Sequence, residues 1–282
     1  MITCVTVEHL RREITAHKSA GKRIGFVPTM GALHEGHLSL ARTLTEHCEV
    51  RVCSIFVNPT QFNDPRDYQA YIINLEADKK ALEREGVDIL FAPTVEEMYP
   101  RGFQSTVSLS EITKPWEGAS RPGHFAGVAT VVTVLFNAVQ PDVAIFGEKD
   151  FQQLRLIEQM VSDLKMGIKI VRGKLVRDND GLALSSRNAR LSPQGRKDSL
   201  AISRGLAAAC EACEGGERNA RVLEDVVATS VRAVHGAEID YIAAVREDTL
   251  EQIDRVEGRC RILVVVKIDG VRLLDNMALK QV

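Results

Sequence analysis

The sequence predicts an α/β fold, with a Rossmann-like, doubly wound parallel sheet in residues 1–176 and a smaller α+β domain in residues 177–282. Two observations support this fold class. Between residues 8 and 171, short apolar runs alternate with helical patterns, which is typical of a parallel sheet covered by helices on both faces. After residue 176 the order changes to helices followed by strands, and Asp269-Gly270 is typical of the turn of an antiparallel hairpin.

The larger domain begins with an amphipathic helix and then alternates strands with helices. Gly21 and Gly86 end helices, and Pro59 ends a strand, because these residues interrupt regular structure. Pro141 likewise separates a strongly apolar helix from the next strand. In chain order we expect helices at residues 8–20, 38–44, 75–85, 127–139 and 151–165, and strands at residues 23–27, 50–57, 87–91, 142–146 and 168–171.

The segment from Tyr99 to Phe125 is expected to be irregular. It is rich in Gly, Pro and Ser and contains the only tryptophan, Trp116. Long irregular connections inside compact domains tend to be lids or binding loops. We therefore expect a lid or a binding loop here.

In the smaller domain, Ser192 and Pro193 are typical of an N-cap and a first helical position. We expect one helix from there to about Cys213, a second at residues 220–234, and strands at residues 239–245, 260–268 and 271–274. Cys210 and Cys213 form a Cys-x-x-Cys pair in the first of these helices. Because they follow no redox-fold strand and have no second cysteine pair for zinc, we interpret them as structural.

The composition is that of an ordinary globular protein. The 282 residues are 45% hydrophobic, which is enough to fill a core, and the formal net charge is −2. This balance gives no general electrostatic case for nucleic-acid or membrane binding. The first residues lack the pattern of a secretory leader, no segment reaches about 18 continuous apolar residues, and the six scattered cysteines suit reduced thiols. We expect a cytoplasmic protein that binds neither nucleic acid nor membrane.

The segment Pro28-Thr29-Met30-Gly31-Ala32-Leu33-His34-Glu35-Gly36-His37 is the leading candidate for a binding site. It joins an apolar strand to a helix, and its glycines allow a ligand to approach the backbone closely. A helix N-terminus offers unpaired N–H groups and a positive dipole end to phosphate. His34 and His37 can both donate to phosphate oxygens. The alternatives are a glycine turn with two surface histidines, or a metal pair, for which no third ligand lies nearby.

Other polar segments follow strands or the change in pattern. Asn58–Phe62 and Gly147–Gln153 come after strands, whose carboxyl ends collect ligands in open α/β sheets, and Leu184–Asn188 follows the domain boundary. Taken singly, Lys149 is equally well read as a loop charge and Arg187 as part of a surface turn. Together with the histidines, these segments supply a lysine, an arginine and hydroxyls suited to binding a triphosphate.

Five segments resemble the pantoate–β-alanine ligases, or pantothenate synthetases, in order and in spacing. They are Pro28–His37, Ser54–Phe62 (Ser-Ile-Phe-Val-Asn-Pro-Thr-Gln-Phe), Arg121–Phe125 (Arg-Pro-Gly-His-Phe), Phe146–Leu154 (Phe-Gly-Glu-Lys-Asp-Phe-Gln-Gln-Leu) and Asp180–Asn188 (Asp-Gly-Leu-Ala-Leu-Ser-Ser-Arg-Asn). The resemblance covers essentially the whole chain. Each of these motifs is long, so chance similarity in five of them is implausible.

The resemblance implies ATP-dependent condensation of (R)-pantoate with β-alanine to give pantothenate. The reaction would pass through a pantoyl-adenylate and release pyrophosphate and AMP. It would take place in a cytoplasmic homodimer that uses Mg²⁺, with no protein side chain assigned as a metal ligand. The larger domain would bind nucleotide and pantoate, and the smaller domain would act as a lid.

The resemblance also implies roles for individual residues. His34, His37 and Lys149 would be catalytic, with the histidines on the ATP phosphates, His37 as a proton donor, and Lys149 near the α-phosphate. Gln61 and Gln153 would bind pantoate, and Gln61 would also face β-alanine. The residues that would contact ATP are Met30, Gly31, Ala32, Leu33, His34, Glu35, Gly36, His37, Gly147, Glu148, Lys149, Asp150, Val176, Leu184, Ser185, Ser186 and Arg187.

The chain departs from the family pattern in two places. Leu184 stands where the family usually has methionine, a swap of similar volume that we expect to be harmless. Tyr71-Ile72-Ile73-Asn74 stands where the family usually has Tyr-Pro-Arg-Thr, so a cation and a rigid turn are missing there. If that arginine contributes to binding or to subunit contact, we expect this chain to be weaker there.

Two other functions remain open at this point. A nucleotidyltransferase that moves AMP onto a phosphorylated acceptor shares the histidine turn, but it predicts a basic acceptor site, whereas Gln61 and Gln153 suit an unphosphorylated hydroxy acid. A nucleotide-sensing protein without turnover needs ATP affinity but neither the Ser185-Ser186-Arg187 set nor the two glutamines.

Overall fold

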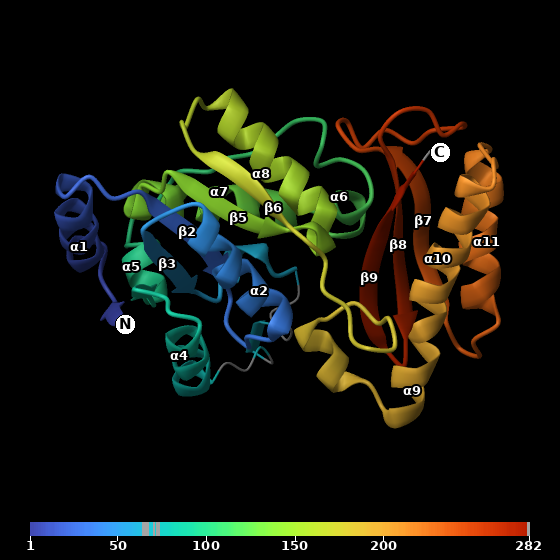
Figure 1. Ribbon diagram of the computed structural model, residues 1–282, viewed down its shortest axis with the longest axis horizontal. Helices are drawn as coiled ribbons and strands as arrows, with labels where there is room; N and C mark the ends of the chain where they lie inside the picture. The colour runs from blue at the N-terminus through green and yellow to red at the C-terminus, as the bar shows by residue number, and fades with distance from the viewer. Residues whose placement is uncertain (64–67, 70, 72–73, 281–282) are drawn as a thin grey trace. The chain divides into compact units, whose positions relative to one another are not determined.

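A computed structural model describes residues 1–63, 68–69, 71 and 74–280 of the chain (Figure 1). The chain divides into two units. The first comprises Met1–Glu148 and Gln152–Lys174, and the second comprises the chain from Leu175 onward together with the short stretch Lys149–Phe151. This stretch follows the fifth strand of the first unit along the chain, yet it groups with the second unit.

The first unit is built on a six-stranded sheet whose neighbouring strands are all parallel, in the order β1-β4-β3-β2-β5-β6. The central strands β2, β3 and β5 are nearly continuous buried apolar runs, as expected for a parallel sheet that helices cover on both faces. The strands are β1 (Ile2–Cys4), β2 (Ile24–Thr29), β3 (Val50–Ile55), β4 (Ile89–Phe91), β5 (Val143–Gly147) and β6 (Lys169–Gly173).

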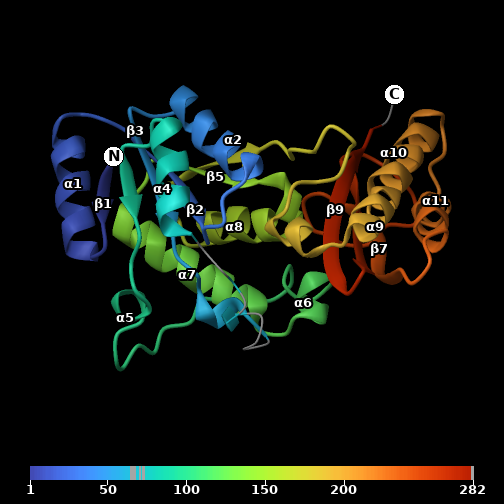
Figure 2. The same ribbon diagram turned by 90° about the horizontal axis from the view of Figure 1, so that it is seen from below.

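Helices cover both faces of this sheet. Figure 2 shows α2 and α4 on one face and α7 and α8 on the other. The helices are α1 (Val7–Ser19), α2 (Glu35–Thr43), α4 (Leu75–Arg84), α5 (Val95–Met98), α6 (Glu117–Ser120), α7 (His124–Val139) and α8 (Phe151–Asp163), with 3-10 turns η1 (Leu44–Glu46), η2 (Pro59–Gln61) and η3 (Glu148–Asp150). The predicted doubly wound α/β architecture is therefore confirmed.

The strand order reverses between β2 and β5. From β2 the chain continues to β3 and β4 on one side, and from β5 it continues to β6 on the other. Ligands of doubly wound sheets bind outside the carboxyl ends of the strands at such a switch point. β2 ends at Thr29 and β5 ends at Gly147, so two of the predicted binding segments begin there.

Some predicted elements of this unit differ from the structure. β1 was not predicted, because an edge strand of only three residues leaves almost no pattern. Residues 99–125 were expected to be irregular, but α6 lies within them, and α7 begins at His124 rather than at Gly127. Gly123 precedes α7 with a φ of 83°, which only glycine adopts readily, so the Pro122-Gly123 turn concealed where the helix begins.

The second unit packs helices against an antiparallel sheet of three strands in the order β7-β8-β9. Asp269 and Gly270 form the predicted hairpin turn with φ values of 54° and 72°. One helix was predicted from Ser192 to Cys213, but the structure has two, because the Ser199 hydroxyl bonds back to the Gly195 carbonyl at 2.7 Å and the chain bends there. The elements are η4 (Ser186–Arg190), α9 (Pro193–Asp198), α10 (Leu200–Glu214), α11 (Ala220–Arg232), β7 (Glu238–Arg246), β8 (Cys260–Ile268) and β9 (Val271–Leu279).

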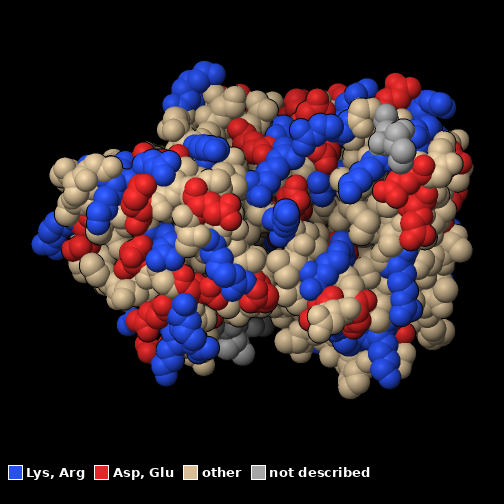
Figure 3. Space-filling model, in the orientation of Figure 1, with Lys and Arg blue, Asp and Glu red and all other residues tan. Residues whose placement is uncertain are grey.

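The face drawn in Figure 3 carries charges of both signs, and the cysteines form no disulfides. Figure 3 shows Lys and Arg interspersed with Asp and Glu on each unit. All six cysteines are free, and Cys210 and Cys213 lie on α10 with their sulfurs against the Ala278 and Lys280 carbonyls at 3.5 and 3.4 Å. Burial raises the pKa of both thiols, which disfavours the reactive thiolate. In the part of the chain that the structure describes, no helix is long and apolar enough to cross a membrane.

Candidate active site

The turn after β2 is held by the last residue of that strand. The buried Thr29 hydroxyl donates to the Ser54 carbonyl at 2.7 Å and accepts from the Gly31 N–H at 3.2 Å. Gly31 and Ala32 follow with φ values of 80° and 52°. Glycine adopts this region readily but alanine does not, so surrounding contacts must hold Ala32 there.

Those contacts come from Asp78, a buried carboxylate on α4. Its oxygens accept the N–H groups of Ala32 and Leu33, each at 2.8 Å. Hydrogen bonds from backbone N–H groups to an ionised carboxylate are among the stronger ones in proteins. Because both N–H groups bond to Asp78, a phosphate bound at this turn would rely on other donors.

The two histidines at the start of α2 cap the helix with one nitrogen each. His34 is the N-cap residue, and its Nδ1 accepts the Gly36 N–H at 3.1 Å. His37 Nδ1 in turn accepts the His34 N–H at 3.4 Å, and the ring centroids lie 4.2 Å apart. A neutral imidazole whose Nδ1 accepts a hydrogen bond carries its proton on Nε2. We therefore assign Nε2–H to both rings, which makes the Nε2 atom of each ring a hydrogen-bond donor.

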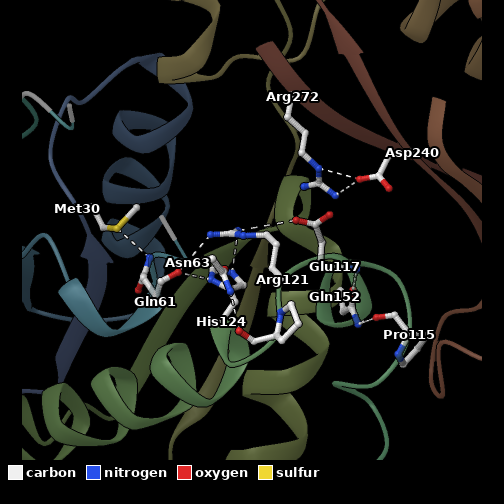
Figure 4. A network of polar contacts seen from close by, with 11 residues as sticks. Met30, Gln61, Asn63, Pro115, Glu117, Arg121, His124, Gln152, Asp240 and Arg272 are labelled. Carbon is white, nitrogen blue, oxygen red and sulfur yellow. Dashed lines mark hydrogen bonds and ion pairs between the residues drawn. The ribbon is translucent and has the colours of Figure 1, made fainter. Parts of the chain in front are cut away.

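Gln61 lies on η2 and is oriented by Asn58. The side chain of Asn58, which is 1% exposed, donates from Nδ2 to Gln61 Oε1 at 3.1 Å and to the Gly127 carbonyl at 3.2 Å. Tyr99 donates to Asn58 Oδ1 at 2.8 Å, and burial raises the pKa of this hydroxyl, which keeps it protonated as a donor. Gln61 Nε2 points toward Met30 of the turn, 2.9 Å from its sulfur (Figure 4). The structure thus brings Gln61 and the turn together.

The backbone of Gln61 is held by the start of α7. His124 Nδ1 donates to the Gln61 carbonyl at 2.8 Å, and Arg121 Nη2 donates to the same carbonyl at 3.2 Å (Figure 4). Arg121 Nη1 also lies 3.1 Å from His124 Nε2, which makes that nitrogen the acceptor. Glu117 Oε2 lies 3.8 Å from Arg121. Two hydrogen bonds to one carbonyl fix the Gln61 backbone, and so the position from which its side chain extends.

The remaining predicted residues of the first unit lie after β5 and on α8. Gly147 is the last residue of β5, Glu148 begins η3 directly after it, and Gln153 is half-buried in the first turn of α8. The neighbouring Gln152 is 4% exposed and binds the loop before α6 (Figure 4). Its Oε1 accepts the Glu117 N–H at 3.0 Å, and its Nε2 donates to the Ile112 and Pro115 carbonyls at 2.9 Å. Gln152 therefore anchors the loop that carries Trp116.

In the second unit, Lys149, Ser185 and Arg187 line one pocket, together with Asn188 and Arg272. The Ser185 hydroxyl accepts the Arg187 N–H at 3.2 Å and so begins η4. The Leu184 N–H donates to the Val176 carbonyl at 3.0 Å. The other predicted residues of this unit are Asp150, which is exposed, and Ser186, which is half-buried.

A family model described as pantoate–β-alanine ligase matches residues 2–278. The chain belongs to this family. It is 46% identical over 281 residues to the pantothenate synthetase of Pelotomaculum thermopropionicum, covering 100% of both chains, and 48% identical over 272 residues to that of Cereibacter sphaeroides, covering 96% of this chain and 97% of the relative. The predicted family is confirmed, and these relatives do not favour the nucleotidyltransferase alternative.

Solved structures of pantoate–β-alanine ligases have the same fold. The pantothenate synthetase of Thermus thermophilus superposes with a TM-score of 0.93 at 44% identity, covering 98% of this chain and 99% of that chain. The pantoate–β-alanine ligase of Francisella tularensis, solved in complex with β-γ ATP and β-alanine, superposes with a TM-score of 0.80 at 35% identity, covering 98% of this chain and 97% of that chain. The chain is thus an enzyme of the C–N bond-forming ligase class.

Several residues that shape this ligase site were given no role from the sequence, although Arg121 and His124 lie in the motif Arg121–Phe125 that contributes to the resemblance. Asp78, Arg121, His124 and Gln152 act on backbone groups far along the chain, and spacing alone indicates no such pairing. Asn58 was noted only as the residue at a strand end. Its position before Pro59 does indicate an N-cap, because asparagine is common at that position. In the structure Asn58 caps η2 by accepting the Thr60 N–H at 3.3 Å.

The departure at Tyr71–Asn74 is described only in part. Ile72 and Ile73 lie outside the described residues. The Tyr71 hydroxyl lies 3.5 Å from the Gly31 carbonyl, and Asn74 caps α4 by accepting the Ala77 N–H at 3.1 Å. Tyr71 therefore lies against the turn itself, and Asn74 begins the helix whose Asp78 holds the turn.

Proposed function

We propose that this chain condenses (R)-pantoate with β-alanine to form pantothenate in two steps, through a pantoyl-adenylate. The observation that carries the proposal is the family match over residues 2–278, on a fold whose switch point bears the histidine turn. The related ligase of Francisella tularensis was solved in complex with β-γ ATP and β-alanine, which supports ATP and β-alanine as substrates of this chain.

Adenylation makes the carboxylate reactive. A carboxylate does not acylate an amine at neutral pH, because its leaving group is oxide. In the first step a pantoate carboxylate oxygen attacks the α-phosphorus of ATP, the bond from that phosphorus to the bridging oxygen breaks, and pyrophosphate leaves. In the second step the β-alanine nitrogen attacks the acyl carbon, the bond from that carbon to the oxygen that bridges it to phosphorus breaks, AMP leaves with that oxygen, and the nitrogen loses a proton. The enzyme's task is to position the reactants and stabilise negative charge.

The resemblance assigns phosphate contacts to the histidine turn of the first unit and, separately, to residues of the second unit. His34 and His37 donate from Nε2 to phosphate oxygens, and His37 acts as a proton donor to the departing pyrophosphate. Lys149 offsets charge at the α-phosphate, where two anions meet. Ser185, Ser186 and Arg187 bind the outer phosphates through hydroxyls and a bidentate guanidinium. Met30–Gly36, Gly147–Asp150, Val176 and Leu184 complete the ATP contacts.

Pantoate binds to Gln61 and Gln153. An amide offers both a donor and an acceptor, so it serves a hydroxyl or a carboxylate without adding charge to a site that already holds two anions. The anchoring of Gln61 by Asn58, Arg121 and His124 supports this role, because a fixed amide loses little entropy on binding. Gln61 also faces β-alanine in the second step.

Magnesium enters with the nucleotide. Among residues 1–63, 68–69, 71 and 74–280, no group of three or more His, Cys, Asp and Glu side chains is placed to hold a metal ion. Mg²⁺ prefers phosphate oxygens and water and is often carried by the triphosphate itself, so we assign no metal-binding side chain. The enzyme works as a homodimer in the cytoplasm.

The test is pantoate-dependent exchange of labelled pyrophosphate into ATP, with magnesium and without β-alanine. Exchange that requires pantoate is expected, because formation of the adenylate is reversible. Addition of β-alanine should then release AMP and pantothenate in equal amounts. Lys149→Ala is expected to lower the exchange rate by about 100-fold or more while retaining part of the ATP affinity. A folded, ATP-binding sample that shows neither reaction would refute the proposal.

A further inference from the structure

A buried polar cluster lies at the three-stranded sheet of the second unit. Arg261 on β8 and Glu247 after β7 are each 6% exposed, and Asn276 on β9 is 3% exposed. Arg261 Nη2 lies 2.9 Å from Glu247 Oε1, and Arg261 Nη1 donates to Asn276 Oδ1 at 2.6 Å. The cluster therefore consists of an Arg–Glu ion pair whose arginine also hydrogen-bonds to a buried side-chain amide.

This cluster ends at Lys149. Asn276 Nδ2 donates to the Lys149 carbonyl at 2.8 Å. The Arg261 guanidinium stacks on the Phe151 ring, with its Cζ 4.1 Å from the ring centroid. Asn276 and Arg261 thus hold the two ends of Lys149–Phe151, the stretch that belongs to the second unit although β5 before it belongs to the first.

Stability alone does not account for such a cluster. Removing an arginine and a glutamate from water costs several kcal/mol per ion, and their attraction offsets this only when the remaining polar atoms are also bonded. A buried network whose members are bonded to one another favours a single arrangement of the chain around it. In this cluster, the backbone that is held in one arrangement is that of Lys149.

We propose that Asn276, held by Arg261 and Glu247, is a positioning residue for Lys149. This inference rests on the proposed function, in which Lys149 stabilises charge at the α-phosphate. By binding the Lys149 carbonyl, Asn276 fixes the position of the Lys149 backbone. The backbone position in turn limits the positions that the Lys149 ammonium group can occupy. Misplacing a reacting group by about 1 Å can cost on the order of 100-fold in rate.

Asn276→Asp is the sharpest variant. Aspartate has the size of asparagine and still accepts from Arg261, but its carboxylate cannot donate to the Lys149 carbonyl. We expect the single-turnover rate of pantoate-dependent adenylation to fall about 10- to 100-fold, with the dissociation constant for ATP changed less than about threefold. Asn276→Ser removes the side-chain bonds to Arg261 and to the Lys149 carbonyl without adding a charge, and it replaces Asn276→Asp if the latter does not fold.

Arg259→Ala is the matched control. Arg259 pairs with the other oxygen of Glu247 at 3.0 Å, and its side chain is 79% exposed. The substitution disturbs the same ion cluster from the solvent side and leaves the Arg261, Asn276 and Lys149 contacts in place. We expect this variant to adenylate at the wild-type rate.

A double-mutant cycle separates positioning from a general structural effect. If Asn276 acts through the Lys149 side chain, Asn276→Asp should lower the adenylation rate in the wild-type background but not further in Lys149→Ala. An equal loss in both backgrounds would overturn the proposal, as would a wild-type rate in Asn276→Asp itself.

Hydrogen–deuterium exchange tests the link without relying on catalysis. Peptides covering residues 147–153 should exchange faster in Asn276→Asp than in wild type or Arg259→Ala, because the carbonyl anchor at Lys149 is lost. Unchanged exchange would also overturn the proposal. Failure of the proposed function is distinguishable, because the wild-type chain would then lack pantoate-dependent exchange of pyrophosphate while this structural readout still responds.

Discussion

At the scale of single residues, the histidine pair shows one side chain serving two purposes through its two nitrogens. The Nδ1 atoms of His34 and His37 accept backbone N–H groups at the start of α2. This capping sets both tautomers, so the Nε2 atoms carry the protons that the proposed phosphate contacts need. Stability and phosphate binding therefore depend on different atoms of the same ring, and substitutions can separate them.

We predict that His34→Asn and His34→Ala differ in stability but not in activity. Asparagine is a good N-cap and replaces the Nδ1 acceptor, whereas alanine does not, so His34→Ala should lose about 1 kcal/mol of unfolding free energy and His34→Asn much less. Both variants lack the Nε2 donor and should adenylate pantoate about 100-fold more slowly. Urea unfolding and pyrophosphate exchange measure the two effects.

The opposite pattern would contradict this division. If His34→Asn retained wild-type exchange, Nε2 would have no part in the chemistry and the ring would serve only as a cap. Glu46→Ala is a suitable control, because Glu46 lies in η1, beyond the end of α2, and has an exposed side chain.

At the scale of elements, α4 supports the phosphate turn through one side chain. The Asp78 carboxylate accepts two N–H groups of the turn at 2.8 Å each. In Asp78→Asn one of the two oxygens becomes an NH₂ group, so one partly buried N–H loses its acceptor.

We predict that Asp78→Asn lowers the unfolding free energy by about 1–3 kcal/mol. Dissociation constants for ATP should rise about tenfold, because part of the binding energy goes into reordering the turn. Calorimetric titration with ATP and urea unfolding measure these effects. Glu76→Gln, an exposed change in the first turn of the same helix, should alter neither; unchanged ATP affinity in Asp78→Asn would show that the turn holds its shape alone.

The contact between α7 and η2 depends on a glycine. A Cβ on Gly127 would lie 2.5 Å from the Thr60 carbonyl oxygen and 2.9 Å from the Gln61 Cα, distances that require the backbone to move. We predict that Gly127→Ala displaces Gln61 and raises the KM for pantoate about tenfold or more, with a smaller change in the KM for ATP. Steady-state kinetics with each substrate varied in turn tests this. Equal rises in both KM values would point to a general loss of folded structure instead.

At the scale of the whole molecule, the sheet was predictable because its information is local. Apolar runs such as Val50–Ile55 fill a strand buried on both faces, and the residues that stop them are Gly, Asn and Pro. β1 was not predicted because three residues are too few for a pattern. The bend at Ser199 was not predicted because it depends on one side-chain hydrogen bond. The division into two domains at 176 and 177 stays a prediction.

The candidate site was predictable in part for the same reason. Continuous segments, such as residues 28–37, carry their chemistry within one stretch and can be compared with a family. Asp78 lies 46 residues from Ala32, and Asn276 lies 127 residues from Lys149, so only the folded chain pairs them. Residues that position others are the ones that sequence patterns miss, because their partners are backbone groups of any residue type. The roles assigned to the predicted site residues stay predictions.

The pH dependence of stability above pH 9 concerns the whole molecule, because thiols whose pKa is raised by full or partial burial lie in both units. Burial raises the pKa of Cys4, Cys48 and Cys210 to about 11 and that of Cys53 to about 12, from an ordinary value of 9.0. Between pH 9 and 11 the unfolded chain therefore releases thiol protons that the folded chain keeps. Since the folded state then binds more protons, the unfolding free energy must fall as the pH rises through this range.

We predict that each such thiol contributes a slope of up to about 1.4 kcal/mol per pH unit above pH 9, and that below pH 8 the thiols add no slope. Urea unfolding under reducing conditions at pH 7.5, 9 and 10 gives the slope for the wild-type chain. Cys53→Ala should reduce the slope by one thiol's share even if it lowers stability at every pH, because the cavity cost does not titrate. Lysine and tyrosine side chains titrate in both proteins, so the difference between the two slopes isolates the thiol. Equal slopes would mean that Cys53 ionises alike in the folded and unfolded chain, which its complete burial in β3 argues against.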